Sequence, residues 1–314
     1  MKKSICRMAL LMLILLYIPH AAASELLIPV GEVIALELEN DHVTVAALDG
    51  DHSQLQVGDE LRSIDGRRIQ CVEDVRTALA ASDGTVEVEL LRGKQVLRLK
   101  IDPRISAEGP QLGVYLRQGI TGIGTVTYFD PDNGTFGALG HGVSDSVGKL
   151  VTMERGNAYK ARVLSVRRGK TGVPGQLMGA LSDAQPMGKL DKNTSCGIFG
   201  SCEGFSGHPI PTADPGEIHT GSAVIRSTIG GSTPREYSVE ILKIYPNSNK
   251  EGRNLLLKIT DPQLLSTTGG IVQGMSGSPI IQDGKLVGAV THVLVNDPTT
   301  GYGIFIENML DSAA

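Results

Sequence analysis

The sequence predicts a mainly β protein in which a small α+β domain precedes a larger β-barrel domain. The chain of 314 residues has 39 glycines but 7 tyrosines, 5 phenylalanines and no tryptophan, a composition that suits short strands and tight turns. Its apolar content of 41% is that of a globular protein. From residue 111 onward, short apolar runs follow one another with almost no helical periodicity, which favours strands.

The first 23 residues have the pattern of a signal peptide or an N-terminal membrane anchor. Lys2, Lys3 and Arg7 precede the apolar run Met8–Ile18, and small alanines follow. We therefore expect an exported protein, and the pattern leaves open whether the segment is cleaved. The net charge of −5 gives no reason to expect a nucleic-acid binder.

Residues 24–105 alternate between strand and helix patterns. Short strands are expected at Glu32–Leu38 and His42–Leu48, with a turn between them. Apolar residues spaced at i, i+3 and i+7 predict a helix near Glu73–Ala81. Alternating residues within 86–101 then predict a closing hairpin.

The run Leu55-x-x-Gly-Asp-x-Leu-x-x-Ile-Asp-Gly resembles a PDZ domain of the bacterial protease-associated type. The resemblance implies that a peptide adds as a strand to a free sheet edge beside the helix. By the same resemblance, the receiving loop is 28–33, with Glu32 an unfavourable neighbour for a terminal carboxylate, so internal peptides stay open as ligands. The alternative hypothesis is a small α+β domain that serves only as a spacer for the next domain. The implied peptide-binding residues are Pro29, Val30, Gly31 and Val33.

A segment rich in Pro, Gly and charge at 102–110 predicts a linker, and we place the domain boundary near residue 106. Residues 106–314 then form the second domain, an all-β barrel or sandwich. Its clearest strand patterns are Gly119–Phe129, Thr135–Leu139, Ala161–Val166, Ala223–Ile229, Tyr237–Ile244, Leu255–Thr260 and Leu286–Val295.

The three cysteines after the N-terminal segment predict no disulfide scaffold. Cys196 and Cys202 could close a small loop as a disulfide or remain free thiols. Their spacing, taken with His208, matches no common zinc pattern. We expect no metal and no cofactor.

Two loops of the second domain have the residues of a serine hydrolase. His141 lies between two glycines at the end of an apolar strand, where an imidazole is open to substrate. Ser276 lies in Gly274-Met275-Ser276-Gly277-Ser278-Pro279, which resembles the nucleophile loop of chymotrypsin-like serine proteases. A serine hydroxyl needs a base, and the attacked carbonyl oxygen needs donors, here the N–H groups of Gly274 and Ser276.

Taken together, these segments and the Asn193-Thr194 region resemble the stage IV sporulation protein B peptidase family over nearly all of residues 25–312. The resemblance implies exported serine endopeptidases of endospore-forming bacteria that act between the two membranes around the forespore. Such enzymes cleave a membrane-bound regulator of an intramembrane metalloprotease, which leads to sigma-factor processing. They also cleave themselves, here expected within residues 24–50.

The resemblance also assigns roles to residues. His141 is the general base, Ser276 the nucleophile and Asp261, fifteen positions before the serine, the acid. From the residues alone, other acids compete for the last role, and His292 reads as a structural histidine that could also line the cleft. The competing acids are Asp183, Asp191 and Asp214.

Two other functions remain open at this point. One is a catalytically idle, exported PDZ adaptor. The other is a general envelope stress protease, although such enzymes usually carry the PDZ domain after the protease domain.

Overall fold

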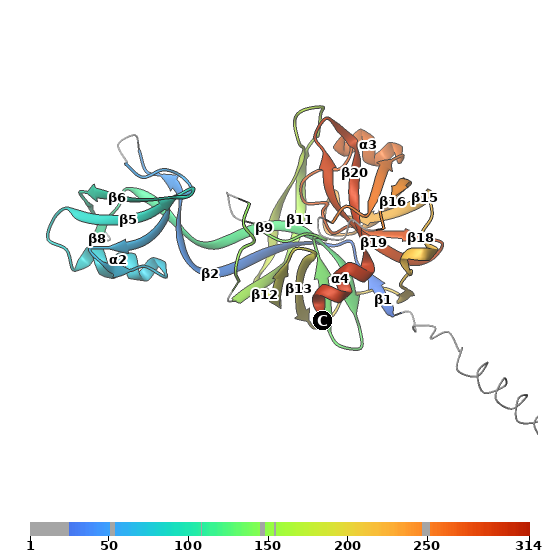
Figure 1. Cartoon of the computed structure of the whole chain (residues 1–314), viewed down its shortest axis with the longest axis horizontal. Helices are drawn as coiled ribbons and strands as arrows, with labels where there is room; N and C mark the ends of the chain where they lie inside the picture. The colour runs from blue at the N-terminus through green and yellow to red at the C-terminus, as the bar shows by residue number, and fades with distance from the viewer. Residues whose placement is uncertain (1–24, 51–53, 108, 145–147, 154, 247–251) are drawn as a thin grey trace, which may run out of the picture.

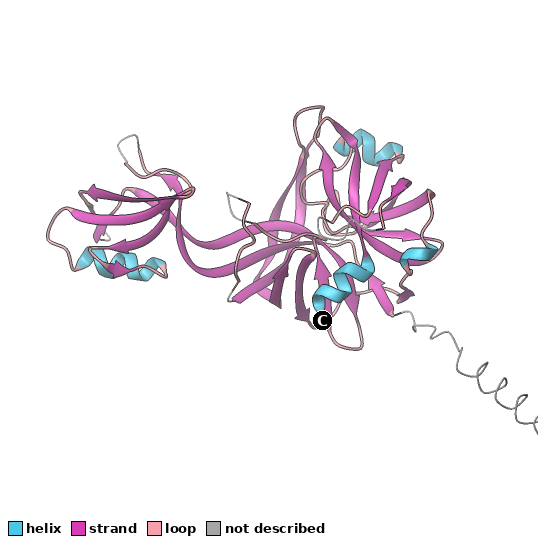
Figure 2. Cartoon of the chain, viewed as in Figure 1, coloured by secondary structure: helices cyan, strands magenta, loops and turns pink. Residues whose placement is uncertain are grey.

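The structure is a computed structural model that describes residues 25–314 except 51–53, 108, 145–147, 154 and 247–251. Strands dominate it, with a few short helices (Figure 2). Two groups of strands close into barrels, and a smaller unit lies at the far end of a long two-stranded arm (Figure 1).

The first barrel is a closed ring of six antiparallel strands. Going round the ring, each strand pairs with the next, and the pairing of β2 with β9 closes it. Alternate side chains such as Leu36, Val126 and Phe136 fill the interior. In ring order the strands are β2 (Val33–Leu48), β9 (Val114–Asp130), β10 (Thr135–Ala138), β13 (Gly197–Cys202), β12 (Gln176–Thr194) and β11 (Arg155–Arg167).

The second barrel also has six antiparallel strands and a separate core. Ile225, Val239 and Leu257 point into it from three neighbouring strands, because side chains alternate along each strand. Its ring order is β15 (Gly221–Ser227), β16 (Arg235–Ile244), β17 (Leu255–Ile259), β20 (Asp297–Phe305), β19 (Lys285–Leu294) and β18 (Pro279–Gln282).

Short elements complete the barrels. Helix α3 connects β17 to the loop before β18, and α4 packs against β13, β19 and β20. Their bounds are α3 (Pro262–Thr268), α4 (Ile306–Ala313), η1 (Pro215–Glu217), β1 (Leu26–Pro29) and β14 (Ile210–Pro211).

The small unit packs one helix against a sheet. Helix α2 is the helix that the apolar spacing predicts, and it buries Val75 and Leu79 against the sheet. A buried carboxylate, Asp59, is neutralised by a two-point contact from Arg92 at 2.7 Å. Besides the ends of β2 and β9, the unit contains β3 (Glu60–Ile64), β4 (Arg67–Arg68), α2 (Val72–Ala80), β5 (Val86–Arg92), β6 (Gln95–Ile101), β7 (Arg104–Ser106) and β8 (Gly109–Gln111).

The small unit is inserted into the first barrel, which differs from the predicted domain order. Strands β2 and β9 are long enough to serve both parts: Ile34 pairs with Gly124 in the barrel, and Val43 pairs with Gln118 in the small unit. A break in register between Leu38 and Val43 separates the two halves, and Figure 1 shows the arm that the two strands form. Residues 26–38, which we expected in the N-terminal domain, therefore belong to the first barrel. Strand β9 remains in the small unit as far as Gln118, beyond the predicted boundary near residue 106.

Two six-stranded antiparallel barrels are the arrangement typical of the chymotrypsin-like fold, so the predicted fold class is confirmed. Among the residues that the structure describes, no helix is both long and apolar enough to cross a membrane.

Candidate active site

One cleft receives a candidate catalytic residue from each barrel. His141 follows β10 of the first barrel, and Ser276 precedes β18 of the second. Both line a cavity of about 410 Å³, together with Gly274 and His292. Residues 135 positions apart in the sequence are thus brought to one site by the packing of the two barrels.

The nucleophile loop is tied to the first barrel through its backbone. Thr125 of β9 donates its N–H to the Ser276 carbonyl at 3.0 Å and its hydroxyl to the Gly274 carbonyl at 2.7 Å. Thr127 donates to the Gly277 carbonyl at 2.8 Å. Because both threonines are fully buried, these bonds are shielded from water and hold the serine in place.

Gly277 is required by space as well as by conformation. Its φ of +95° lies in the region that favours glycine. A Cβ atom there would lie 2.0 Å from the Thr125 carbonyl oxygen and 2.5 Å from the Leu139 nitrogen. Any other residue would push the nucleophile loop away from the first barrel.

The loop also offers two backbone donors. Within the described part of the chain, neither the N–H of Gly274 nor that of Ser276 has a hydrogen-bond partner. Gly274 has a φ of +99° and lines the cleft. The two N–H groups that the sequence assigned to an oxyanion hole are therefore unpaired beside the serine.

The Ser276 hydroxyl is not bonded to the histidine in this structure. Its Oγ donates to the Thr291 carbonyl on β19 at 2.8 Å. To act as a nucleophile it must leave this carbonyl and give its proton to His141. Apo sites often show catalytic hydrogen bonds that form only with substrate bound.

The His141 ring has a defined orientation without a carboxylate. Its Nδ1 lies 2.9 Å from the Gly142 carbonyl oxygen, so this nitrogen carries the proton and Nε2 is free to accept one. Burial lowers the pKa of His141 below its usual 6.5, with the Gly142 contact opposing this to a smaller extent. The imidazole is therefore neutral at neutral pH and can accept a proton.

Two residues around His141 were not assigned catalytic roles from the sequence. The His292 ring lies 5.3 Å from the His141 ring, between centroids, and lines the same cleft. Asn193 of β12 accepts from the Val143 N–H at 2.9 Å and donates to the carbonyls of Val143 and Val151, each at 2.9 Å. Asn193 thus ties Val143 to Val151 in the segment that follows His141. In the sequence, the only sign of this role was the Asn193-Thr194 pair.

The structure does not bring Asp261 to His141. The Asp261 carboxylate accepts from the Leu264 N–H at 2.8 Å and caps the N-terminus of α3. The site lies at the other end of β17, where the Gly252 carbonyl accepts from the Thr291 hydroxyl at 2.7 Å. The five residues of β17 separate the two ends by about 16 Å, at about 3.3 Å per residue.

The competing acids are no closer to the site. Asp183 and Asp191 are exposed on β12, and Asp214 caps the short helix η1. Among the described residues, none of these carboxylates lines the cleft. The acid of the predicted triad is therefore missing from the observed geometry, and the Gly142 carbonyl occupies the Nδ1 side of the base.

The four residues assigned to peptide binding lie in the first barrel, not in the small unit. Pro29 pairs with Tyr128, and the N–H groups of Val30 and Gly31 donate to strand β9 at 3.1 and 2.8 Å. Val33 begins β2 of the first barrel, but its side chain packs into the core of the second barrel. The loop 28–33 is thus part of the contact between the barrels, because the chain enters the first barrel before it reaches the small unit.

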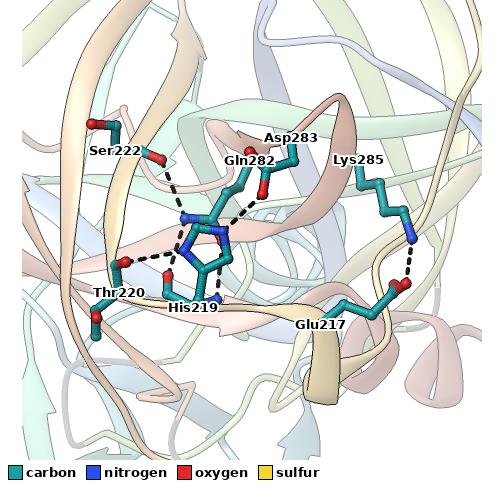
Figure 3. Close-up of polar contacts among 7 residues, drawn as sticks. All are labelled: Glu217, His219, Thr220, Ser222, Gln282, Asp283 and Lys285. Carbon is teal, nitrogen blue, oxygen red and sulfur yellow. Dashed lines mark hydrogen bonds and ion pairs between the residues drawn. The ribbon is translucent and has the colours of Figure 1, made fainter.

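A histidine–carboxylate pair lies on the surface, outside the cleft. His219 Nε2 contacts Asp283 Oδ2 at 2.8 Å, and Lys285 contacts Glu217 beside it (Figure 3). Gln282 joins the two segments by donating to the carbonyls of His219 and Ser222 at 3.0 and 3.2 Å. These contacts fasten the segment before β15 to the β18–β19 turn, and His219 lies outside the cleft that Ser276 lines.

Cys71, Cys196 and Cys202 are free thiols in the structure. In the described ranges, no group of three or more His, Cys, Asp or Glu side chains is arranged to hold a metal ion.

Comparisons with known proteins give a family and a set of distant structures. Residues 108–310 match the model of the family described as SpoIVB peptidase S55. No curated protein matches the chain. Similar solved structures include the active form of the Rv3671c protease from M. tuberculosis, with 15% identity and a TM-score of 0.38, covering 61% of this chain and 72% of that one. The inactive form of the same protease has 14% identity and a TM-score of 0.35, covering 60% of this chain and 81% of that one.

Proposed function

The chain belongs to the SpoIVB peptidase S55 family and is a serine peptidase, and on that premise we propose that it is an exported endopeptidase that cleaves a membrane-bound regulatory protein, and itself, during sporulation. The observation that carries the catalytic assignment is the meeting of His141 and Ser276 in one cleft, with two unpaired N–H groups beside the serine. The signalling role and the export rest on the resemblance and on the basic and apolar N-terminal segment.

Acyl transfer follows from this geometry. His141 Nε2 takes the proton of the Ser276 hydroxyl as Oγ attacks the substrate carbonyl. The oxygen of the tetrahedral intermediate accepts from the N–H groups of Gly274 and Ser276. His141 then passes the proton to the leaving amine, and a water molecule repeats the sequence to release the acyl group.

The imidazolium that forms in this reaction is stabilised at Nδ1 by the Gly142 carbonyl rather than by a carboxylate. A neutral acceptor stabilises a cation less than an anion does, so we expect a slow peptidase by the standard of enzymes with an Asp partner. A slow, selective enzyme is compatible with a protease that cleaves few substrates.

The small unit is proposed to bind a peptide at an edge different from the predicted one. The start of β9, residues 114–117, pairs with β2 on one side, and α2 contacts β9. Within the described residues, no strand pairs with its other side. An extended peptide could add there as a further strand, beside the exposed Tyr115 ring.

Self-cleavage is constrained by the strand pairing. Strands β1 and β2 of the predicted 24–50 region are built into the first barrel. A cut before Leu26 leaves every barrel strand intact, so we propose that self-cleavage falls there.

A fluorophosphonate probe tests the catalytic assignment. We expect labelling of the purified protein that is lost in Ser276→Ala and strongly reduced in His141→Ala. Ser278→Ala is the matched control, because Ser278 lies in the same loop but is fully buried and bonded to Ser227 and the Met275 carbonyl. Labelling that survives in Ser276→Ala would disprove the nucleophile assignment.

One observation favours a second function. The Ser276 hydroxyl donates to Thr291 and not to His141, as expected of an idle site in an exported adaptor. Absence of labelling in a folded protein, with and without vesicles and substrate peptide, would favour that function.

A further inference from the structure

The β11–β12 hairpin concentrates positive charge in an acidic protein. Residues 155–182 include Arg155, Lys160, Arg162, Arg167, Arg168 and Lys170, with no aspartate or glutamate. The whole chain has a net charge of −5. This local excess has no role in the catalytic geometry described above.

Three of these six cations have no carboxylate partner among the described residues. Arg162, Arg167 and Lys170 are exposed, whereas the neighbouring Ala161 and Val163 point into the core. Within the described residues, neither Arg162 nor Lys170 forms an ion pair. Arg167 donates only to a neutral partner, the Gln176 side-chain oxygen, at 3.1 Å.

Large apolar side chains lie among the exposed cations. Leu164 is 62% exposed, Val173 56% and Met178 47%. Met178 lies opposite Ser165 in the strand register, which places it next to Leu164 on the outer face of the hairpin. We call Arg162, Leu164, Arg167, Lys170, Val173 and Met178 the hairpin patch.

The turn end of the hairpin patch, at Lys170 and Val173, lies close to the mouth of the catalytic cleft. Lys170 and Val173 exchange backbone hydrogen bonds at the hairpin turn, and the Gly172 N–H donates to the Val295 carbonyl at 2.8 Å. Val295 and Pro174 both line the cleft. In Figure 1, β11 rises toward α3, away from the small unit.

We propose that the hairpin patch binds the surface of an anionic lipid bilayer. Cations that surround exposed apolar side chains are the composition of interfacial membrane-binding segments, in which the apolar groups enter the headgroup region and the cations meet lipid phosphates. An acidic protein segment would satisfy the charge but would leave the outward Leu164 and Met178 without a hydrophobic partner of their own. Binding would hold the cleft beside the membrane surface, and it is independent of the peptidase activity.

The absence of tryptophan gives a residue-specific test in the full chain. Leu164→Trp makes the chain's only tryptophan a reporter on the hairpin. Val96→Trp is the matched control, because Val96 is 63% exposed in a strand of the small unit. The reporter senses its own surroundings, so the N-terminal segment can contact lipid without changing the interpretation.

We expect the Leu164→Trp emission to shift to shorter wavelength with vesicles of phosphatidylglycerol and phosphatidylcholine, and doxyl-labelled lipid to quench it. Phosphatidylcholine vesicles should have little effect, and Val96→Trp should not respond. Adding Arg162→Gln to Leu164→Trp should weaken the apparent affinity about fivefold, and high salt should weaken it further.

Three results would overturn the proposal. The first is an unchanged Leu164→Trp emission with anionic vesicles, although the protein cosediments with them. The second is an equal shift on neutral vesicles, and the third is a shift with polyglutamate but not with vesicles, which would assign the patch to an acidic protein partner. Met178→Trp serves as the second reporter if circular dichroism shows that Leu164→Trp is not folded.

Discussion

Replacing Asp261 distinguishes a helix cap from a catalytic acid, because the two roles differ greatly in magnitude. As the N-cap of α3, the carboxylate contributes one hydrogen bond to the Leu264 N–H at 2.8 Å. Loss of such a cap costs about 1 kcal/mol of stability, and asparagine replaces aspartate there at little cost. As the acid of a triad, the same Asp→Asn change lowers kcat by about 10⁴-fold.

We therefore expect Asp261→Asn to keep both stability and the rate of fluorophosphonate labelling within about twofold. Asp261→Ala should lower the free energy of unfolding by about 1 kcal/mol, measured by urea denaturation, and the protein should stay folded because domains are stable by about 5–15 kcal/mol. Since α3 leads directly into the nucleophile loop, we expect some loss of labelling in Asp261→Ala. Asp261→Asn should keep the labelling rate, because asparagine can also cap the helix. A 10⁴-fold loss in Asp261→Asn at unchanged stability would refute the capping role and return Asp261 to the catalytic site.

Three further predictions concern the loops around the cleft. Gly277→Ala should lose labelling and several kcal/mol of stability, because its Cβ would lie 2.0 Å from the Thr125 oxygen. The control Gly284→Ala, at a φ of +76° with open space around it, should cost about 1 kcal/mol of stability and keep activity. The labelling rate should fall as the pH drops through the lowered pKa of His141, and a pH profile with its midpoint above 6.5 would contradict this. Between the unfolded pKa near 6.5 and the lowered folded pKa, the folded state binds fewer protons than the unfolded one, so lowering the pH through this range should also reduce stability. Asn193→Ala should cost about 1–3 kcal/mol and reduce labelling, whereas an unchanged denaturation midpoint would show that its three bonds do not hold the loop.

The sequence allowed the fold class to be predicted, and it singled out the two loops that the structure brings to one cleft, because both depend on local patterns. Ser276 and His141 each lie in glycine-rich loops whose composition follows from backbone geometry, as the positive φ values of Gly140, Gly274 and Gly277 show. Strands β15 and β16 of the second barrel alternate between buried and more exposed residues, and they were found near their observed bounds for that reason.

Other strands gave no such signal. Strand β12 is 19 residues long, yet its middle part is exposed on both faces, contains Pro186 and is flanked by Gly179 and Gly188. Its pairing with β11 changes register three times, so no period of two runs through it. Strand β20 contains glycines where the neighbouring strand passes closely, which weakens its apolar pattern.

The order of domains and the acid of the site were decided by contacts between distant parts of the chain. Ile34 pairs with Gly124 across 90 positions, and a pattern within either segment says only that it is a strand, not which strand it meets. The loop 28–33 was therefore assigned to the small unit, although pairing places it in the first barrel. Asp261 likewise matched by spacing, but β17 carries it to the far end of the second barrel.

By itself, then, the sequence determined the chemistry available to this protein: a serine in a glycine-bounded loop, a histidine in another, and a mainly β chain to carry them. Only the tertiary structure decided which groups meet: His141 contacts Gly142 and His292, and Ser276 contacts Thr291. It also decided that the small unit lies at the end of an arm. The physical reason is that local conformation depends on neighbouring residues, whereas sheet pairing and barrel packing are settled by the burial of side chains and the satisfaction of backbone groups far apart in the chain.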